Sequence, residues 1–488
     1  MREVFDHVIE GSMNLEIPLT GFKPGDDLTI MNTMQSRYFD DKEKYHELLT
    51  LVFKDNKTGL KHKEEIIDPL YEFYTVDKEN HTDWNRLFVE QEKTEAHVAP
   101  HKSIARYVAD SVGLGRWYRQ TMEAGNKNDA RQIHTHPDVF MSDQNLEDHY
   151  RFWFDRNFTN EQCSISKSYF DIEVDGIHMR GDFPEMGECP VNAITVFFQD
   201  KMQAYTLLLR SSENELIPAF EKFITEHGTQ DLHDFICNYV TSQRAGKKNA
   251  SLNTENIKYS IALFDEDKEI DLISTFFKLI NTYNPDFAMA WNQAFDIPYL
   301  IARCERLGYD PAQVMSHPDF TYKQAEYFID ERALNEPAER CDVCTISAYT
   351  TYLDQMIQFA SRRKGQTQFP SMKLDDIGEV IAGVHKLDYK EITTNITLLP
   401  YKDYKTFVYY NVMDVIVQYC IESTVEDIDF VFGKALVNNT RYPKVHRQTV
   451  YLANRAAKEF RKGGFIIGNN NNRTNSKPTE KFPGVKCS

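Results

Sequence analysis

The segment YFDIEVDG, residues 169–176, places two carboxylates in an otherwise apolar stretch. In a β-strand, residues i and i+2 lie on the same face, so Asp171 and Glu173 share one face while their apolar neighbours face the core. Two adjacent carboxylates repel each other unless a cation lies between them, and hard oxygen ligands suit Mg²⁺ or Mn²⁺. Taken alone, the segment is better interpreted as an edge strand with a solvated acidic face.

A second segment, MAWNQAFDIPYL (residues 289–300), follows the pattern of a buried strand, a turn and a helix. We expect the strand at Phe287–Trp291, with Asn292 and Phe295 in the turn. Asp296 is then expected at the N-terminal end of the helix. The alternative is an ordinary helix N-cap, a position that Asp favours in any protein.

A third segment, VYYNVMDVIVQY (residues 408–419), predicts a strongly apolar helix. Tyr410 and Asp414 are four residues apart, so they share a face of that helix. A carboxylate on a buried helix is costly unless it is paired or bound to a metal. A Lys or Arg partner elsewhere in the chain is the simpler explanation of Asp414 by itself.

Together the three segments resemble the motifs of the DEDD exonucleases: D-x-E, then an Asn followed by Phe-Asp, then Y-x₃-D. The tyrosine marks the DEDDy subgroup, and the fold that this resemblance implies is ribonuclease-H-like. Three further stretches are similar to phage replicative DNA polymerases of family B, and the similarity covers most of residues 40–485. They are HPDVFMSDQNLEDHYRFWF, GDFPEMGECPVNAITVF and TTYLDQMIQFASRRKGQTQFPSMKLDDIGEVIAG.

The chain departs from these polymerases because the palm motifs D-x-x-SLYPS and YGDTDS are absent. The resemblance therefore implies the N-terminal and exonuclease half of a polymerase, without palm, fingers or thumb. We expect a second polypeptide to supply those parts. Two alternatives remain open, namely a free-standing 3′–5′ exonuclease and a non-catalytic module for DNA binding or assembly.

The resemblance also implies roles for the acids in hydrolysis of DNA 3′ ends. Asp171, Glu173 and Asp414 are expected to hold one Mg²⁺ or Mn²⁺ ion. Asp171 is expected to bridge to a second ion, which Asp296 supports through water. Two such ions activate the attacking water and stabilise the leaving oxygen.

Three other residues are implied to contact the water or the substrate. Tyr410 is expected to orient the nucleophilic water through its hydroxyl, since a phenol is a poor base at neutral pH. Asn292 and Phe295 are expected to hold the terminal nucleotide, Phe295 by packing on its sugar or base. The DNA partner is expected to be a primer-template or a single-stranded 3′ end.

The order of predicted elements indicates a mixed α/β fold. Three successive strands are expected at Tyr169–Val174, Ala193–Gln199 and Gln203–Leu209, followed by alternating helices and strands. We expect an α+β N-terminal domain at 1–160, the exonuclease domain at 161–430, and a return segment with a basic linker at 431–488. Within the first domain, Leu49–Lys54 and Leu70–Val76 flank DNKTG and are predicted to form a hairpin.

Composition limits the other possibilities. The 488 residues carry a net charge of −18, which argues against a general basic coat for nucleic acid but not against a local basic channel. A basic triplet, Arg362–Lys364, could contact DNA phosphates or form a solvated helix end. The sequence shows no apolar membrane-spanning stretch and no signal peptide, and its eight cysteines are few. These features predict a cytoplasmic protein without a membrane partner.

Overall fold

The computed structural model describes residues 19–77, 87–181, 183–244, 252–365 and 369–469. The chain divides into two compact units, of which the first combines residues 1–162 with 434–488 and the second spans 163–433. The predicted mixed α/β class is confirmed. The candidate site lies in the second unit, which is described first.

The second unit is built on a six-stranded mixed sheet with the strand order β11-β10-β9-β8-β12-β15. β8 pairs antiparallel with β9 and parallel with β12. A separate two-stranded ribbon joins β13 and β14. The strands are β8 (Lys167–Val174), β9 (Val191–Phe198), β10 (Gln203–Leu209), β11 (Lys258–Phe264), β12 (Phe287–Ala290), β13 (Ala325–Phe328), β14 (Val343–Ile346) and β15 (Thr351–Asp354).

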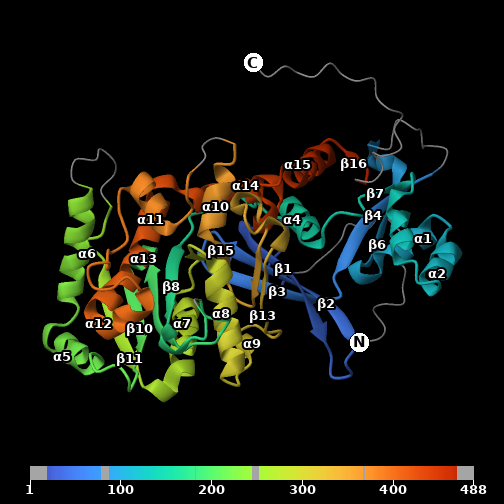
Figure 1. Ribbon diagram of the computed structural model, residues 1–488. Coiled ribbons are helices and arrows are strands. Elements are labelled where there is room, and N and C mark those ends of the chain that lie inside the picture. Colours follow the sequence, from blue (N-terminus) through green and yellow to red (C-terminus); the bar gives the residue numbers. More distant parts are fainter. Residues whose placement is uncertain (1–18, 78–86, 182, 245–251, 366–368, 470–488) are drawn as a thin grey trace. The chain divides into compact units, whose positions relative to one another are not determined.

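Helices cover both faces of this sheet (Figure 1). On one face, α7 and α8 pack against a large apolar core that includes Phe170, Ile194 and Phe276. On the other face, α13 packs against β8 and β9. The helices of this unit are α5 (Ile217–His227), α6 (Gln230–Gln243), α7 (Glu269–Tyr283), α8 (Gln293–Arg306), α9 (Pro311–Met315), α10 (Gln355–Arg362), α11 (Leu374–Ile377), α12 (Leu399–Lys402) and α13 (Tyr404–Val425). A central mixed sheet with helices on both faces is consistent with a ribonuclease-H-like exonuclease domain.

The first unit contains three small sheets, with strand orders β1-β2-β3, β6-β4-β7 and β16-β5. Its strands are β1 (Leu28–Phe39), β2 (Tyr45–Asp55), β3 (Lys61–Ile67), β4 (Leu70–Val76), β5 (Phe88–Glu90), β6 (Thr94–Pro100), β7 (Val139–Phe140) and β16 (Phe465–Ile467). Its helices are α1 (Ile104–Ser111), α2 (Gly115–Glu123), α3 (Lys127–Arg131), α4 (Leu146–Asn157) and α15 (Gln448–Lys462), and α14 (Asp427–Asn438) crosses the division between the units.

One prediction for this unit is wrong. The DNKTG turn joins β2 to Lys61–Ile67, and Leu70–Val76 pairs instead with β6 and β7. The prediction missed β3 because its sequence, KHKEEII, is mostly charged and lacks the apolar alternation of a half-buried strand. Most of the expected basic linker, from 470 onward, lies outside the described residues.

Candidate active site

Strand β8 sends its acidic and apolar side chains to opposite faces of the sheet. Phe170 and Ile172 are buried in the core beneath α7, and the Phe170 ring centre lies 5.2 Å from that of Phe276. Asp171 and Glu173 lie on the other face, toward α13, and are partly exposed. The predicted division of this strand between core and carboxylates is therefore confirmed.

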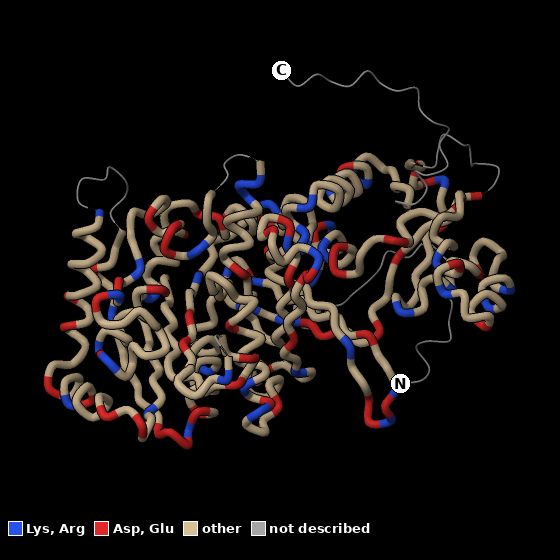
Figure 2. Tube along the Cα trace, viewed as in Figure 1, with Lys and Arg blue, Asp and Glu red and all other residues tan. Residues whose placement is uncertain are grey.

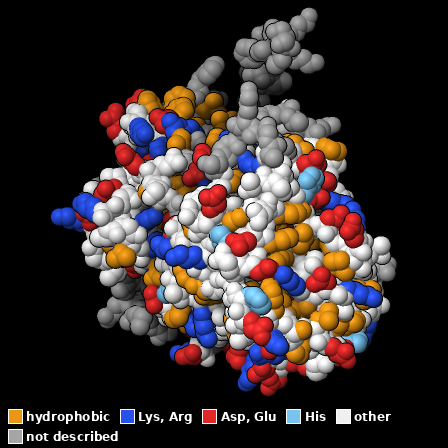
Figure 3. Space-filling model, turned by 90° about the vertical axis from the view of Figure 1, so that its left-hand side faces the viewer, with side chains coloured by type: hydrophobic (Ala, Val, Ile, Leu, Met, Phe, Trp, Pro, Cys, Tyr) orange, Lys and Arg blue, Asp and Glu red, His pale blue; other side chains and the backbone are white. Residues whose placement is uncertain are grey.

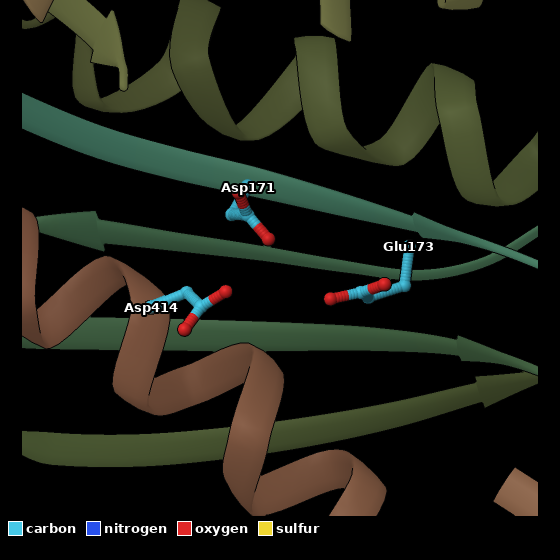
Figure 4. Close-up of side chains that lie close together, drawn as sticks. All are labelled: Asp171, Glu173 and Asp414. Atoms are coloured by element: carbon cyan, nitrogen blue, oxygen red, sulfur yellow. The ribbon is translucent and has the colours of Figure 1, made fainter. Parts of the chain in front are cut away.

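Helix α13 brings a third carboxylate to this face. The Asp403 side chain caps the helix by accepting a hydrogen bond from the Thr406 N–H at 3.0 Å. Three turns later, Asp414 is 2% exposed. One carboxylate oxygen each from Asp171, Glu173 and Asp414 lies within 4.8 Å of the other two (Figure 4), a spacing that could hold a metal ion.

Asp296 lies close to these three acids but outside their group. It is 5% exposed, in the first turns of α8. Burial, then the charge of Asp354 and more weakly that of Glu173, raise the pKa of Asp296 well above its usual value. Asp296 in turn contributes to the raised pKa of Asp171. The structure thus brings three of the predicted ligands together and places Asp296 near enough to raise the pKa of Asp171.

The start of α8 differs from the prediction. The helix begins at Gln293 with Asn292 as its N-cap, so Phe295 lies inside the helix and not in the preceding turn. The physical reason is a hydrogen bond from the Phe295 N–H to the Asn292 carbonyl at 2.9 Å, which closes the first turn early. Asp296 is therefore a residue of the helix and not its cap.

Lys386 is the cationic partner of Asp414 that the sequence analysis offered as an alternative without identifying the residue. Its ammonium donates a hydrogen bond to Asp414 Oδ2 at 2.5 Å and lies 4.7 Å from the centre of the Tyr410 ring. Burial lowers the pKa of Lys386, but Asp414 together with Tyr410 and Asp171 outweighs this effect, and the pKa is raised. An isolated lysine in a loop gives no sequence signal for such a role.

Tyr410 is 8% exposed and remains a neutral phenol. Burial and then the Asp414 charge raise the pKa of its hydroxyl far above the usual value. The hydroxyl also favours the charged form of Asp414. Tyr410 can therefore donate a hydrogen bond in this site but cannot act as a base.

The acids repel one another, and a bound cation would relieve that repulsion. Burial, followed by Asp414, raises the pKa of Glu173 to about 8, and burial likewise raises the pKa of Asp414 despite the nearby Lys386. Asp414 Oδ1 is buried and has no hydrogen-bond partner in the described part of the chain. A set of hard oxygen ligands that includes the unbonded Asp414 Oδ1 fits Mg²⁺ or Mn²⁺.

Two aromatic side chains border the start of α8. The ring centres of Phe295 and Phe183 are 5.4 Å apart in an edge-to-face arrangement, and Phe183 is 68% exposed. Gly187 (φ 70°) lets this segment approach α8, because a Cβ there would lie 2.7 Å from the carbonyl carbon of Ala302. The sequence analysis did not single out Phe183, although an aromatic residue in a Gly- and Pro-containing loop is a weak sign of a contact surface. Asn292 is exposed.

Asp354 is a further acid of this region, 4% exposed, and was not predicted. It ends β15 in register with Ala290 of β12, and its Oδ1 caps α10 by accepting the Ile357 N–H at 2.9 Å. Burial raises the pKa of Asp354 to about 7. In the sequence, an Asp between a strand and a helix resembles an ordinary N-cap. Its proximity to Asp296 could therefore not be predicted.

The basic triplet 362–364 is engaged within the protein. Arg362 and Arg363 each donate to one oxygen of Asp427 at 2.7 Å, and Lys364 pairs with Glu339. Arg362 and Arg363 therefore lie at the end of α10 and are paired with an internal carboxylate, while the phosphate contact stays a prediction. Asp427, which accepts from both arginines, lies more than sixty residues away from them along the chain.

Charge on the described surface is mixed. Lys, Arg, Asp and Glu alternate along the trace (Figure 2), and the face in Figure 3 intersperses acidic, basic and hydrophobic side chains. Among the described residues, no helix combines the length and apolar character needed to cross a bilayer.

Comparison with known families agrees with the chemistry of the acidic group. A search of curated proteins gave no significant match. The family model described as DNA polymerase family B, exonuclease domain, matches residues 116–321. This range includes Asp171, Glu173 and Asp296 and ends before Tyr410 and Asp414. Residues 116–321 therefore support a family B DNA polymerase exonuclease domain in this chain, and with it a 3′–5′ exonuclease function.

Proposed function

We propose that this protein is a DEDDy exonuclease that removes nucleoside monophosphates from DNA 3′ ends in a metal-dependent reaction. One observation carries the proposal: oxygens of Asp171, Glu173 and Asp414, from a strand and a distant helix, lie within 4.8 Å of one another. The three carboxylates repel one another, and Lys386 supplies a single positive charge against them, so a purely structural role does not explain the group.

The four acids have different proposed roles. Asp171, Glu173 and Asp414 hold one divalent cation, and Asp171 together with Asp296 supports a second. Two bound Mg²⁺ or Mn²⁺ ions supply an activated water and stabilise the leaving 3′ oxygen. The raised pKa values of these carboxyls mean that they release protons when they take up cations.

Tyr410 and Lys386 act on the other side of Asp414. The Tyr410 hydroxyl orients the attacking water. Its raised pKa keeps it protonated, so it can donate a hydrogen bond. Lys386 neutralises Asp414 when no cation is bound. At the start of α8, Asn292 and Phe295 hold the terminal nucleotide, and the exposed Phe183 ring extends the aromatic surface on which a base can stack.

We further propose that the chain works as the proofreading half of a phage-type replicative polymerase. The matched family B exonuclease domain supports a proofreading role. The proposed domain limits are 1–160, 161–430 and 431–488. Pairing of β16 with β5 supports a return segment that joins the N-terminal part of the chain. Nucleotide addition then depends on a partner polypeptide that carries palm, fingers and thumb.

The decisive experiment follows digestion of a 3′-labelled single-stranded oligonucleotide with Mg²⁺, with EDTA, and with added dNTPs. Wild-type protein should release mononucleotides only with Mg²⁺, and dNTPs should produce no extension by this chain alone. Asp171→Asn and Asp414→Asn should each lower the rate by orders of magnitude, whereas the exposed Glu226→Gln should not. Wild-type rates in both active-site variants would overturn the proposal. Primer extension restored by a co-purifying polypeptide would support the split polymerase.

A further inference from the structure

Three neighbouring strands place one row of polar side chains across the sheet beneath α13. Asp171 of β8 stands opposite Thr195 of β9, and Thr195 stands opposite Thr206 of β10. Residues opposite each other in adjacent strands send their side chains to the same face. Thr195 and Thr206 are 0% and 1% exposed, so hydroxyls in this row need partners inside the protein.

Asn411 of α13 connects this row to the acidic site. It is fully buried and lies three residues before Asp414. Its Nδ2 donates to Asp171 Oδ2 at 3.1 Å, and its Oδ1 accepts from Thr195 Oγ1 at 2.5 Å. The hydroxyls of Thr195 and Thr206 lie 3.0 Å apart.

The chemistry of these groups fixes the direction of every hydrogen bond in the series. A cation ligand must be ionised and an ionised carboxylate only accepts, so in the metal-bound site the amide nitrogen of Asn411 must face Asp171 and its oxygen must face Thr195. The Thr195 hydroxyl has one proton, which it donates to Asn411, and it therefore accepts from Thr206. We call this series, Thr206 to Thr195 to Asn411 to Asp171, the hydroxyl–amide relay.

A second hydrogen bond keeps α13 in place on the same strand. Gln418, seven residues after Asn411 and 0% exposed, donates through Nε2 to the Phe170 carbonyl at 3.2 Å. The Gln418 carbonyl accepts from Gln355 of α10 at 3.0 Å. The helix is thus hydrogen-bonded to β8 on both sides of Asp414, and a shift of α13 along the strand would break the relay.

We infer that the hydroxyl–amide relay is the device that holds the Asp171 carboxylate in its cation-binding orientation, with Asn411 as a positioning residue. This inference rests on the proposed metal-dependent function. The relay engages Oδ2 of Asp171 and leaves Oδ1 outside it. Hydrogen bonds that orient a ligating carboxylate commonly change metal affinity by roughly 10- to 100-fold. Aligned bonds in a buried series also polarise one another, which strengthens the last bond.

The test replaces one hydroxyl at a time and measures cation binding directly. Thr195→Val removes the relay's central hydroxyl at nearly constant volume, and Thr195→Ser keeps it. Thr351→Val is the matched control, because the Thr351 hydroxyl is buried in the same sheet with no partner among the described residues. Thr206→Val removes the hydroxyl at the far end of the relay. It is the alternative test if Thr195→Val does not fold.

Two readouts are used, Mn²⁺ binding by electron paramagnetic resonance and the Mg²⁺ concentration that half-saturates exonuclease activity. Thr195→Val should weaken both by about 10-fold or more, with activity recovering at high Mg²⁺. Thr206→Val should weaken them by roughly threefold, whereas Thr195→Ser and Thr351→Val should match wild type.

Two contrary results are distinguishable. Wild-type Mn²⁺ binding by folded Thr195→Val and Thr206→Val, in an enzyme that digests DNA, would overturn the relay and leave the nuclease intact. Wild-type protein that neither binds Mn²⁺ nor digests DNA would overturn the proposed function, and the relay inference with it.

Discussion

The Lys386 ammonium lies 2.5 Å from the Asp414 carboxylate, and the two side chains are 25% and 3% exposed. Lys386 provides a positive charge at a site where three acids converge. The protein thus carries an internal counterion for Asp414, which becomes less important when a metal cation binds.

Lys386→Met should therefore destabilise the metal-free protein more than the metal-bound protein. We expect a loss of about 2 kcal/mol in the free energy of unfolding in EDTA, since the variant leaves a buried carboxylate without its charged partner. Saturating Mg²⁺ should reduce this loss. Denaturant unfolding with and without Mg²⁺ measures both values, with the exposed Lys222→Met as control. An equal loss in both conditions would contradict the counterion role.

The raised carboxyl pKa values predict that stability of the metal-free protein depends on pH. The pKa of Glu173 is raised from 4.5 to about 8, so the folded state holds this proton more tightly than the unfolded state. The resulting stability is fully present below about pH 4.5 and is lost as pH rises through about 8. Melting temperature in EDTA should fall across this range, and Glu173→Gln should flatten the fall. Mn²⁺ should stabilise the protein more at higher pH, because its ligands must be deprotonated. A Mn²⁺ effect independent of pH would argue against these acids as ligands.

Removal of the exposed Phe183 ring should weaken binding of the DNA 3′ end without unfolding the protein. Stacking of a base on an aromatic ring contributes about 1–3 kcal/mol, so Phe183→Ala should raise KM roughly tenfold with a smaller effect on kcat. Phe328→Ala removes a ring that is 58% exposed on β13 and is the matched control. Steady-state digestion of a labelled oligonucleotide measures both constants. An unchanged KM for Phe183→Ala would remove this ring from the substrate surface.

Arg363→Gln should affect stability and not DNA binding. Arg363 donates to Asp427, a carboxylate that is 2% exposed, and also to the Phe359 carbonyl at 2.9 Å. Loss of one charged donor to a buried acid should lower the free energy of unfolding by about 1–3 kcal/mol. Thermal unfolding measures the first effect, and KM for the oligonucleotide measures the second. A raised KM with an unchanged free energy of unfolding would support a contact between Arg363 and a DNA phosphate.

Local patterns were sufficient to predict the elements that carry the acids. The alternation in YFDIEVDG predicted a strand at Tyr169–Val174, and the structure has β8 at Lys167–Val174. The apolar segment VYYNVMDVIVQY predicted a helix, and the structure has α13 at Tyr404–Val425. Both predictions succeeded because burial leaves a hydrophobic signal in the sequence itself.

Residues whose roles depend on long-range partners could not be predicted in this way. Lys386 approaches Asp414, and Asn411 approaches Asp171, only through the packing of α13 on the sheet. A lysine in a loop and an asparagine in a helix have no distinguishing local pattern. The early start of α8 was missed although Asn292 is a residue type favoured at the N-cap, because the aspartate at 296 offered a competing cap; in the structure the Asn292 side chain makes no capping hydrogen bond.

The 240 residues that separate Asp171 from Asn411 have a consequence for biosynthesis. Strand β8 leaves the ribosome long before α13 has been translated. The nascent chain therefore carries Asp171 and Glu173 before Asp414 and Asn411 exist. Cleavage of DNA cannot begin until translation has passed Asp414 and the late helix has docked. The order of the elements along the chain thus delays the proposed activity until α13 has been translated.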